Sequence, residues 1–103
     1  MTAEVLNALL EASRLNQRLH ITNFDSELTD LIEAAAADLI GRNAIQPAQL
    51  ESLPVDPLIK QAILTYVKSR FGTPENPERL KADYEDQKAT LMTSTGYTDW
   101  GGI

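Results

Sequence analysis

The side chains of this chain whose types and spacing could support chemistry are carboxylates. Glu27, Asp30 and Glu33 recur every three residues, a spacing that a helix would turn into a row of oxygen ligands for a divalent cation. Such rows are usually solvated helix faces, and we therefore expect no metal site. With Asp38, these residues form an acidic face that either maintains solubility or, in an assembly, keeps a passing nucleic-acid strand from sticking.

Other catalytic groups are scarce. The chain has no cysteine, which excludes disulfides, thiolate metal sites and cysteine nucleophiles. His20 is the only histidine, and no serine-bearing turn accompanies it, which argues against a Ser–His–Asp arrangement and a His-based zinc site. Three of the five glycines, Gly96, Gly101 and Gly102, lie in the C-terminal tail, so no glycine-rich phosphate loop is present. We expect no enzyme activity and no cofactor.

Length and charge narrow the class further. The 103 residues suffice for one domain, and the 43% hydrophobic share allows a core built mainly from Leu, Ile, Val and Ala. No apolar run approaches the roughly 20 residues that span a membrane, and the N-terminus does not resemble a signal peptide. The net charge of −6 excludes tight binding of nucleic acid, because such binding requires an excess of Lys and Arg. Passive tolerance of passing DNA stays open.

The elements that must position these residues are helices. Apolar periodicity predicts an all-α fold, a small bundle of about four helices over approximately residues 2–15, 25–40, 57–71 and 77–91. Asp56-Pro57 and Asn76-Pro77 mark the starts of the last two helices, and Gly41 and Gly72 mark helix ends.

The connections also carry apolar residues. In the connector between the first two helices, we expect Leu19 and Ile21 to tuck under the bundle. The long loop between the second and third helices contains Ile45, Leu50 and Leu53, which we expect to pin it to the core. A single helical turn is predicted near residues 48–52 of this loop.

The last two helices differ in their apolar surface. The third helix is apolar on most of its circumference, which is typical of a helix at the centre of a bundle or one covered by a neighbouring subunit. The fourth has a stripe only one row wide, suited to packing along a single line. The predicted contacts between subunits are Leu64, Val67, Phe71 and Tyr84.

We divide the chain into a helical domain over residues 1–92 and a flexible C-terminal tail over residues 93–103. The tail holds the only Trp and one of three Tyr among glycines. Its aromatic residues either fold back on the bundle or dock on a partner, and the predicted partner contacts are Tyr97, Asp99 and Trp100.

Taken in order, these features resemble the small head–tail connector proteins of tailed bacteriophages, the adaptors that join the portal to the tail. The resemblance covers nearly the whole chain. It departs from the family pattern at His20, where relatives usually carry Arg, and the ending over residues 100–103 lies outside the match. The matching segments are residues 19–21, 24–35, 56–63, 66–67 and 71–72, then Glu78, Arg79, Tyr84 and residues 94–97.

The resemblance implies a structural protein with no catalysis. Its copies would assemble into a homo-oligomeric ring of about twelve on the portal vertex, with DNA passing through the centre without sequence-specific binding. The implied partners are the portal protein, contacted by the tail, and a tail-side connector or stopper protein. The implied location is the head–tail neck of the virion, with assembly in the host bacterial cytoplasm.

A different class of function also fits the residues. A small helical regulatory or binding module could recognise one partner protein through its aromatic tail. It would be a stable monomer or dimer and would form no ring under any condition.

Overall fold

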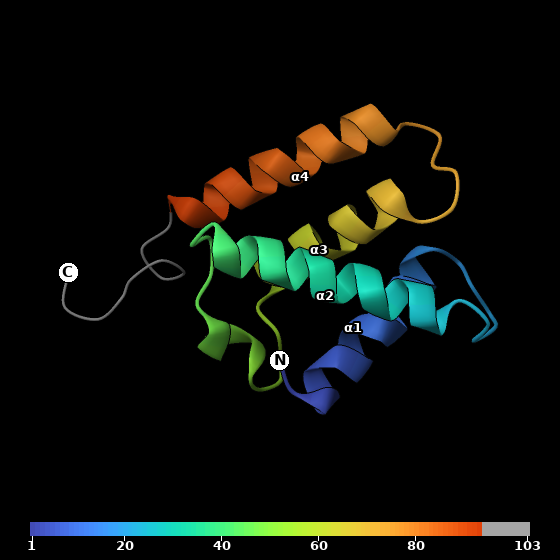
Figure 1. Ribbon diagram of the computed structural model, residues 1–103, viewed down its shortest axis with the longest axis horizontal. Coiled ribbons are helices and arrows are strands. Elements are labelled where there is room, and N and C mark those ends of the chain that lie inside the picture. The colour runs from blue at the N-terminus through green and yellow to red at the C-terminus, as the bar shows by residue number, and fades with distance from the viewer. Residues whose placement is uncertain (94–103) are drawn as a thin grey trace.

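The computed structural model describes residues 1–93, which form four α-helices and one short 3₁₀ helix without any strand (Figure 1). This arrangement confirms the predicted all-α bundle. The elements are α1 Ala3–Asn16, α2 Asp25–Gly41, η1 Pro47–Leu50, α3 Pro57–Arg70 and α4 Pro77–Met92.

The central helix is α3, which packs against α1, α2 and α4. In Figure 1, α4 lies along one edge of the molecule and α1 along the opposite edge, with α2 and α3 between them. Three packing neighbours explain why α3 is apolar on most of its circumference, as the sequence predicted. Its buried side chains, which include Ile59 and Ile63, share one core with aliphatic residues from the rest of the described chain, including Val5, Leu9, Leu28, Ile32, Leu39, Ile45, Leu50 and Leu91.

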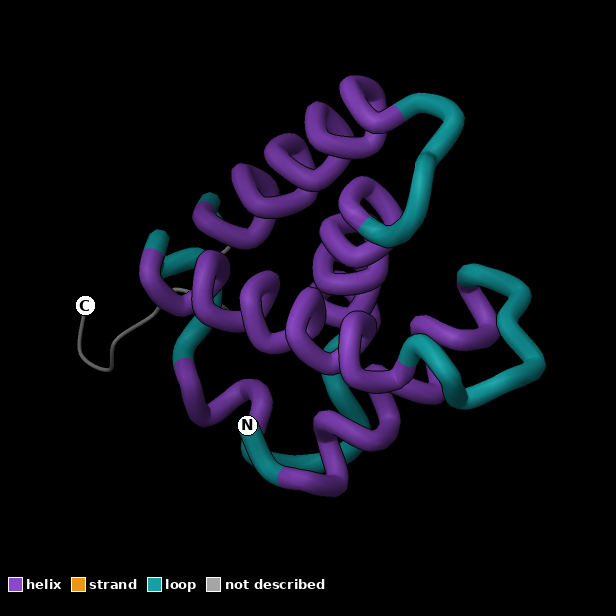
Figure 2. The backbone as a smooth tube through the Cα atoms, turned by 45° about the vertical axis from the view of Figure 1, so that its right-hand side comes forward, coloured by secondary structure: helices purple, strands orange, loops and turns teal. Residues whose placement is uncertain are grey.

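The connectors between α1 and α2 and between α3 and α4 lie at the same end of the bundle (Figure 2). An edge-on contact between the rings of Phe24 and Phe71, with centroids 5.5 Å apart, links the two connectors. Leu19 packs against the core as predicted, but Ile21 is 50% exposed, which makes its prediction wrong. After Leu19 the connector runs over the surface, so the alternation in the sequence does not place Ile21 inside.

The loop between α2 and α3 is pinned by fewer residues than expected. Ile45 and Leu50 are fully buried, and η1 supplies the predicted helical turn between them. Leu53 is 49% exposed, contrary to prediction. The chain from Glu51 to Pro54 lies on the surface and turns inward at Val55, which packs against the core, so Leu53 stays at the rim of a shallow hollow beside Leu9.

The end of α2 also differs from expectation. Gly41 is the last residue of the helix, and the left-handed residue is instead Asn43, with φ of 59°. The Asn43 and Ala44 amides donate to the Ile40 and Leu39 carbonyls at 3.0 and 2.8 Å, the paired bonds of a Schellman end. The left-handed residue therefore lies two positions after Gly41, where it was predicted. This later turn brings the next residue, Ala44, into the core. At the end of α3, by contrast, Gly72 has φ of 62°, as its predicted role requires.

Arg18 ends α1 in the same way and at greater cost. Its φ is 57°, a conformation that costs L-residues other than Gly, Asn and Asp about 1–2 kcal/mol. Because Arg18 is exposed, we expect Arg18→Gly to stabilise the protein by about 0.5–1 kcal/mol, measured by urea unfolding. Asn43→Gly is the control and should stabilise less, since Asn tolerates this conformation. A loss of stability in Arg18→Gly would contradict the assignment.

The two proline-marked helix starts give a matched pair of caps. The Asp56 carboxylate accepts a hydrogen bond from the Leu58 amide at 2.8 Å, which confirms its predicted capping role. Asn76 occupies the same position before α4 but makes no side-chain cap bond, because its backbone, with ψ of 64°, is not extended.

We expect Asp56→Ala to cost about 1 kcal/mol of unfolding free energy and Asn76→Ala only a few tenths. Thermal unfolding followed by circular dichroism measures both changes. Equal losses in the two variants would show that the Asp56 bond does not stabilise α3.

Candidate functional site

The outward side of α2 carries the predicted acidic row. Glu27, Asp30 and Glu33 are exposed, and none forms an ion pair with another residue of the described chain. Within residues 1–93 no group of three or more His, Cys, Asp or Glu side chains could hold a metal ion. That this row lines a channel stays a prediction.

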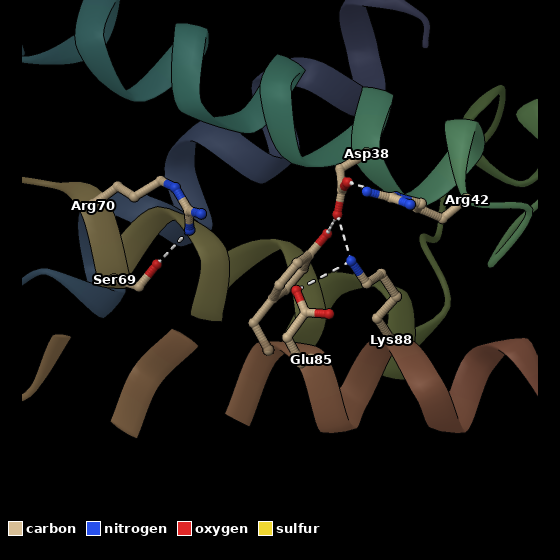
Figure 3. Close-up of polar contacts among 7 residues, drawn as sticks. Asp38, Arg42, Ser69, Arg70, Glu85 and Lys88 are labelled. Carbon is tan, nitrogen blue, oxygen red and sulfur yellow. Dashed lines mark hydrogen bonds and ion pairs between the residues drawn. The ribbon is translucent and has the colours of Figure 1, made fainter. Parts of the chain in front are cut away.

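Asp38, the fourth residue of the predicted acidic face, differs from the other three because it has partners within the protomer. Its carboxylate turns toward α4, where it accepts hydrogen bonds from the Tyr84 hydroxyl at 2.6 Å and the Lys88 ammonium at 3.0 Å (Figure 3). The Arg42 guanidinium, directly after the end of α2, lies 3.8 Å from the Asp38 carboxylate, and Lys88 also pairs with Glu85 at 3.1 Å. Because α4 approaches the C-terminal half of α2, the last acidic residue is covered while the first three stay in solvent.

Burial and charge act in opposite directions on this cluster. Burial alone would raise the pKa of Asp38, but the hydrogen bonds from Tyr84 and Lys88 outweigh it and hold that pKa below its ordinary value. Burial and the bond to the carboxylate both raise the pKa of the Tyr84 hydroxyl. Burial lowers the pKa of Lys88, and the bonds to Asp38 and Glu85 more than compensate, so it lies above its ordinary value.

At neutral pH these directions keep Asp38 ionised, Tyr84 protonated and Lys88 charged. A general acid or base works best when its pKa lies near the working pH. Each of these three shifts moves the pKa of the group further from pH 7. The arrangement therefore holds α2 and α4 together and does not prepare a proton transfer.

The aromatic part of the cluster is internal to the protomer. The Tyr84 ring meets the Tyr66 ring edge-on at 5.1 Å, and the Arg70 guanidinium lies 4.0 Å above Tyr66. Tyr84 is 2% exposed and Val67 is 1% exposed, so both were wrongly predicted as subunit contacts. Packing of α4 along α3 covers them. Leu64 and Phe71, the other two, are partly exposed and stay predicted contacts.

A long groove runs along the outer side of α3 and α4. Its first part, about 550 Å³ in volume, is lined by Lys60, Leu64 and Lys68 of α3 and by α4. A second hollow of about 670 Å³ adjoins it near the α3–α4 connector and includes Arg79. The two parts share three lining residues, Lys68, Leu80 and Asp83, and therefore form one surface.

Sequence reasoning missed the importance of Lys88 and Arg42. Tyr84 and Lys88 are four residues apart, which places them on one side of a helix, and that signal was available. Their common partner Asp38 lies 46 and 50 residues away in the chain, and no local pattern identifies it.

The predicted tail contacts Tyr97, Asp99 and Trp100 lie outside the described residues, and their role stays a prediction. No helix of residues 1–93 is both long and apolar enough to cross a membrane.

Comparison with known proteins identifies the family. The family model described as phage connector protein matches residues 12–98, which is most of the chain. Neither the curated proteins nor the solved structures include a significant match. The matched range contains the Asp38–Tyr84–Lys88 cluster and the α3–α4 groove, and it confirms the resemblance stated from the sequence. This chain therefore belongs to the phage connector protein family.

Proposed function

We propose that the protein is a structural head–tail connector whose copies form a ring on the portal vertex of a tailed phage. The observation that carries this proposal is the family match over residues 12–98 of a helical bundle. A ring of about twelve copies, with DNA passing through its centre, is the arrangement that the family resemblance implies. A net charge of −6 favours passage of DNA without binding, because the chain cannot neutralise many phosphates.

The exposed apolar side chains support assembly into a larger structure. Leu15, Ile21 and Phe24 are exposed around the α1–α2 connector, with Leu15 reaching 73%. Leu53 and Leu58 are exposed near the start of α3. Exposed large apolar residues in two regions of a small protomer favour contacts with other proteins of the particle, which the portal and a tail-side connector or stopper would supply. The corresponding location is the virion neck, after assembly in the host cytoplasm.

The tail would contact the portal. Tyr97, Asp99 and Trp100 combine aromatic area with a charge in a glycine-rich segment, a composition suited to docking in a pocket of another protein. The variant Tyr97→Ala/Trp100→Ala should therefore bind the portal more weakly while keeping the helix content of the wild type.

The decisive experiment mixes the purified protein with the portal protein of the same phage and examines the product by native mass spectrometry and electron microscopy. We expect a portal-dependent annular complex containing several copies of this chain. A protein that stays monomeric or dimeric and never joins the portal would contradict the proposal and favour a small partner-binding module.

A further inference from the structure

We propose that the α3–α4 groove receives the acidic outer face of α2 from a neighbouring copy of this chain. This inference rests on the ring proposed above and specifies which two surfaces meet in it. The groove supplies Lys60, Lys68 and Arg79, and the α2 face supplies the row Glu27, Asp30 and Glu33.

The positive charge of the groove is not used within the protomer. Among the described residues, Lys60, Lys68 and Arg79 form no ion pair, whereas Arg14 and Lys88 both have carboxylate partners. The carboxylates that line the groove are Asp83 and Glu75, so cations outnumber them by three to two. A partner with exposed carboxylates is therefore attracted to this surface.

The groove also contains amides that lack hydrogen bonds. Gln87 Oε1 and Gln17 Nε2 are buried in the described chain without a partner, and the two residues line the first and second parts of the groove. Leaving a buried polar atom unpaired is unfavourable. The Gln17 Nε2 group is a donor that an ionised carboxylate can accept from, whereas Gln87 Oε1 is an acceptor that a carboxylate cannot pair with, so only Gln17 favours an acidic partner. Partly exposed Leu64 and Leu80 provide apolar contact beside these polar groups.

The outer face of α2 matches the groove in charge and dimensions. Glu27 to Glu33 span about 9 Å along their helix, and Lys60 to Lys68 span about 12 Å along theirs, at 1.5 Å per residue. The carboxylates are exposed and unpaired, so no existing ion pair must break. The exposed Ala34 that follows has a short side chain and lets the helix approach closely.

The two surfaces face away from each other in one protomer. The groove residues of α3 lie on the side of that helix opposite its buried residues Ile59 and Ile63, while α2 packs on the buried side. The acidic row points outward from α2. The surfaces therefore cannot pair within a copy, but they can pair between successive copies, and a repeated head-to-tail contact that closes on itself gives a ring.

A charge swap tests this contact. Lys60→Glu/Lys68→Glu makes the groove acidic, and Asp30→Lys/Glu33→Lys makes the α2 face basic. We expect each variant alone to lose ring assembly on the portal and to self-associate at least about tenfold more weakly than the wild type. An equimolar mixture of the two variants should assemble again, because each face then meets a groove of opposite charge.

Lys81→Glu and Asp86→Lys are the matched controls. Both residues are exposed on α4, and neither lines the groove. The control variants should assemble like the wild type. Circular dichroism of every variant establishes that it is folded.

A disulfide measurement tests the contact without depending on charge. Because the chain has no cysteine, Glu33→Cys/Lys60→Cys introduces its only two thiols. Oxidation should link successive copies into covalent multimers, while Glu33→Cys/Lys81→Cys should not form them.

The outcomes separate this inference from the proposed function. If wild-type rings form but the mixture fails to assemble and the cysteine pair does not link, the subunits meet elsewhere and the inference is wrong, while the connector ring stands. If Asp30→Lys/Glu33→Lys assembles normally, the acidic row makes no contact between subunits, as channel lining requires. The inference is then also wrong. If the wild type forms no ring with the portal, both proposals fail.

Discussion

Replacing Tyr84 with Ala is expected to lower the free energy of unfolding by about 4 kcal/mol. The ring is almost fully buried between α4 and α3, and its hydroxyl donates to Asp38. The variant therefore loses apolar burial, the edge-on contact with Tyr66 and a charge-assisted hydrogen bond together. Urea unfolding followed by circular dichroism measures the loss.

The size of this effect follows from the composition of α4. Most of its surface is polar, and its buried residues are Tyr84, Lys88 and Leu91. One of these carries a charge, so the apolar docking of the helix depends mainly on the other two. Removing one of two anchors should loosen α4 from α3 more than an average core truncation would.

Two variants separate the contributions of Tyr84. Tyr84→Phe keeps the ring and removes the hydroxyl, and we expect it to cost about 1–2 kcal/mol. Leu15→Ala truncates an exposed apolar residue and should change stability by less than about 0.5 kcal/mol. If Tyr84→Ala lost no more than the Leu15 control, α4 would not be docked as the structure shows.

The second large effect is expected for Asp38→Ala, at about 2–3 kcal/mol of unfolding free energy. The substitution leaves the Lys88 ammonium, whose side chain is 10% exposed, and the Tyr84 hydroxyl without their carboxylate. Because the Asp38 side chain is itself 29% exposed, water reaches the site in part, and the loss stays below that of a fully buried pair. Chemical denaturation provides the measurement.

A double-mutant cycle identifies the pair as the cause. Asp38→Ala leaves the Lys88 ammonium without its partner, and Lys88→Met removes that charge. The double variant should therefore lose clearly less unfolding free energy than the sum of the two single losses. Glu85→Ala is the control: its side chain is 63% exposed, and the expected cost is under about 0.5 kcal/mol. Additive losses in the cycle would mean that Asp38 and Lys88 do not interact.

The same cluster makes stability depend on pH at both extremes. The folded pKa of Asp38 lies below its ordinary value of 3.8, so the unfolded chain binds more protons in acid. Its contribution is present above pH 3.8 and is lost as the pH falls through the folded pKa. The pKa values of Tyr84 and Lys88 are raised above 10.0 and 10.5, so their contributions are present below these values and are lost at higher pH.

Unfolding measured across pH 2–11 in the variants tests these assignments. Asp38→Asn should flatten the acid limb of the stability curve, and Tyr84→Phe should flatten the alkaline limb. Unchanged limbs in both variants would place the responsible groups elsewhere in the chain.

Local patterns sufficed to predict the fold class and most helix boundaries. Apolar periodicity placed all four helices, the Asp56-Pro57 step marked the start of α3, and Gly72 marked its end. The order of motifs also led to the connector family, which the family match confirmed. The helix positions and boundaries depend on residues that lie close together in the sequence, so a single sequence is enough to predict them.

Tertiary structure alone decided which apolar and charged residues stay at the surface. The sequence alone does not show whether Tyr84 and Val67 face solvent, a second copy or the inside of the protomer. The packing of α4 on α3 is what buries them. Asp38 continues an acidic series in the sequence, yet Tyr84 and Lys88 of α4 bind it and leave it only partly exposed, while Glu33 stays in solvent. Contacts between residues some fifty positions apart depend on how helices pack, and helical periodicity specifies which side of a helix is apolar without specifying what covers it.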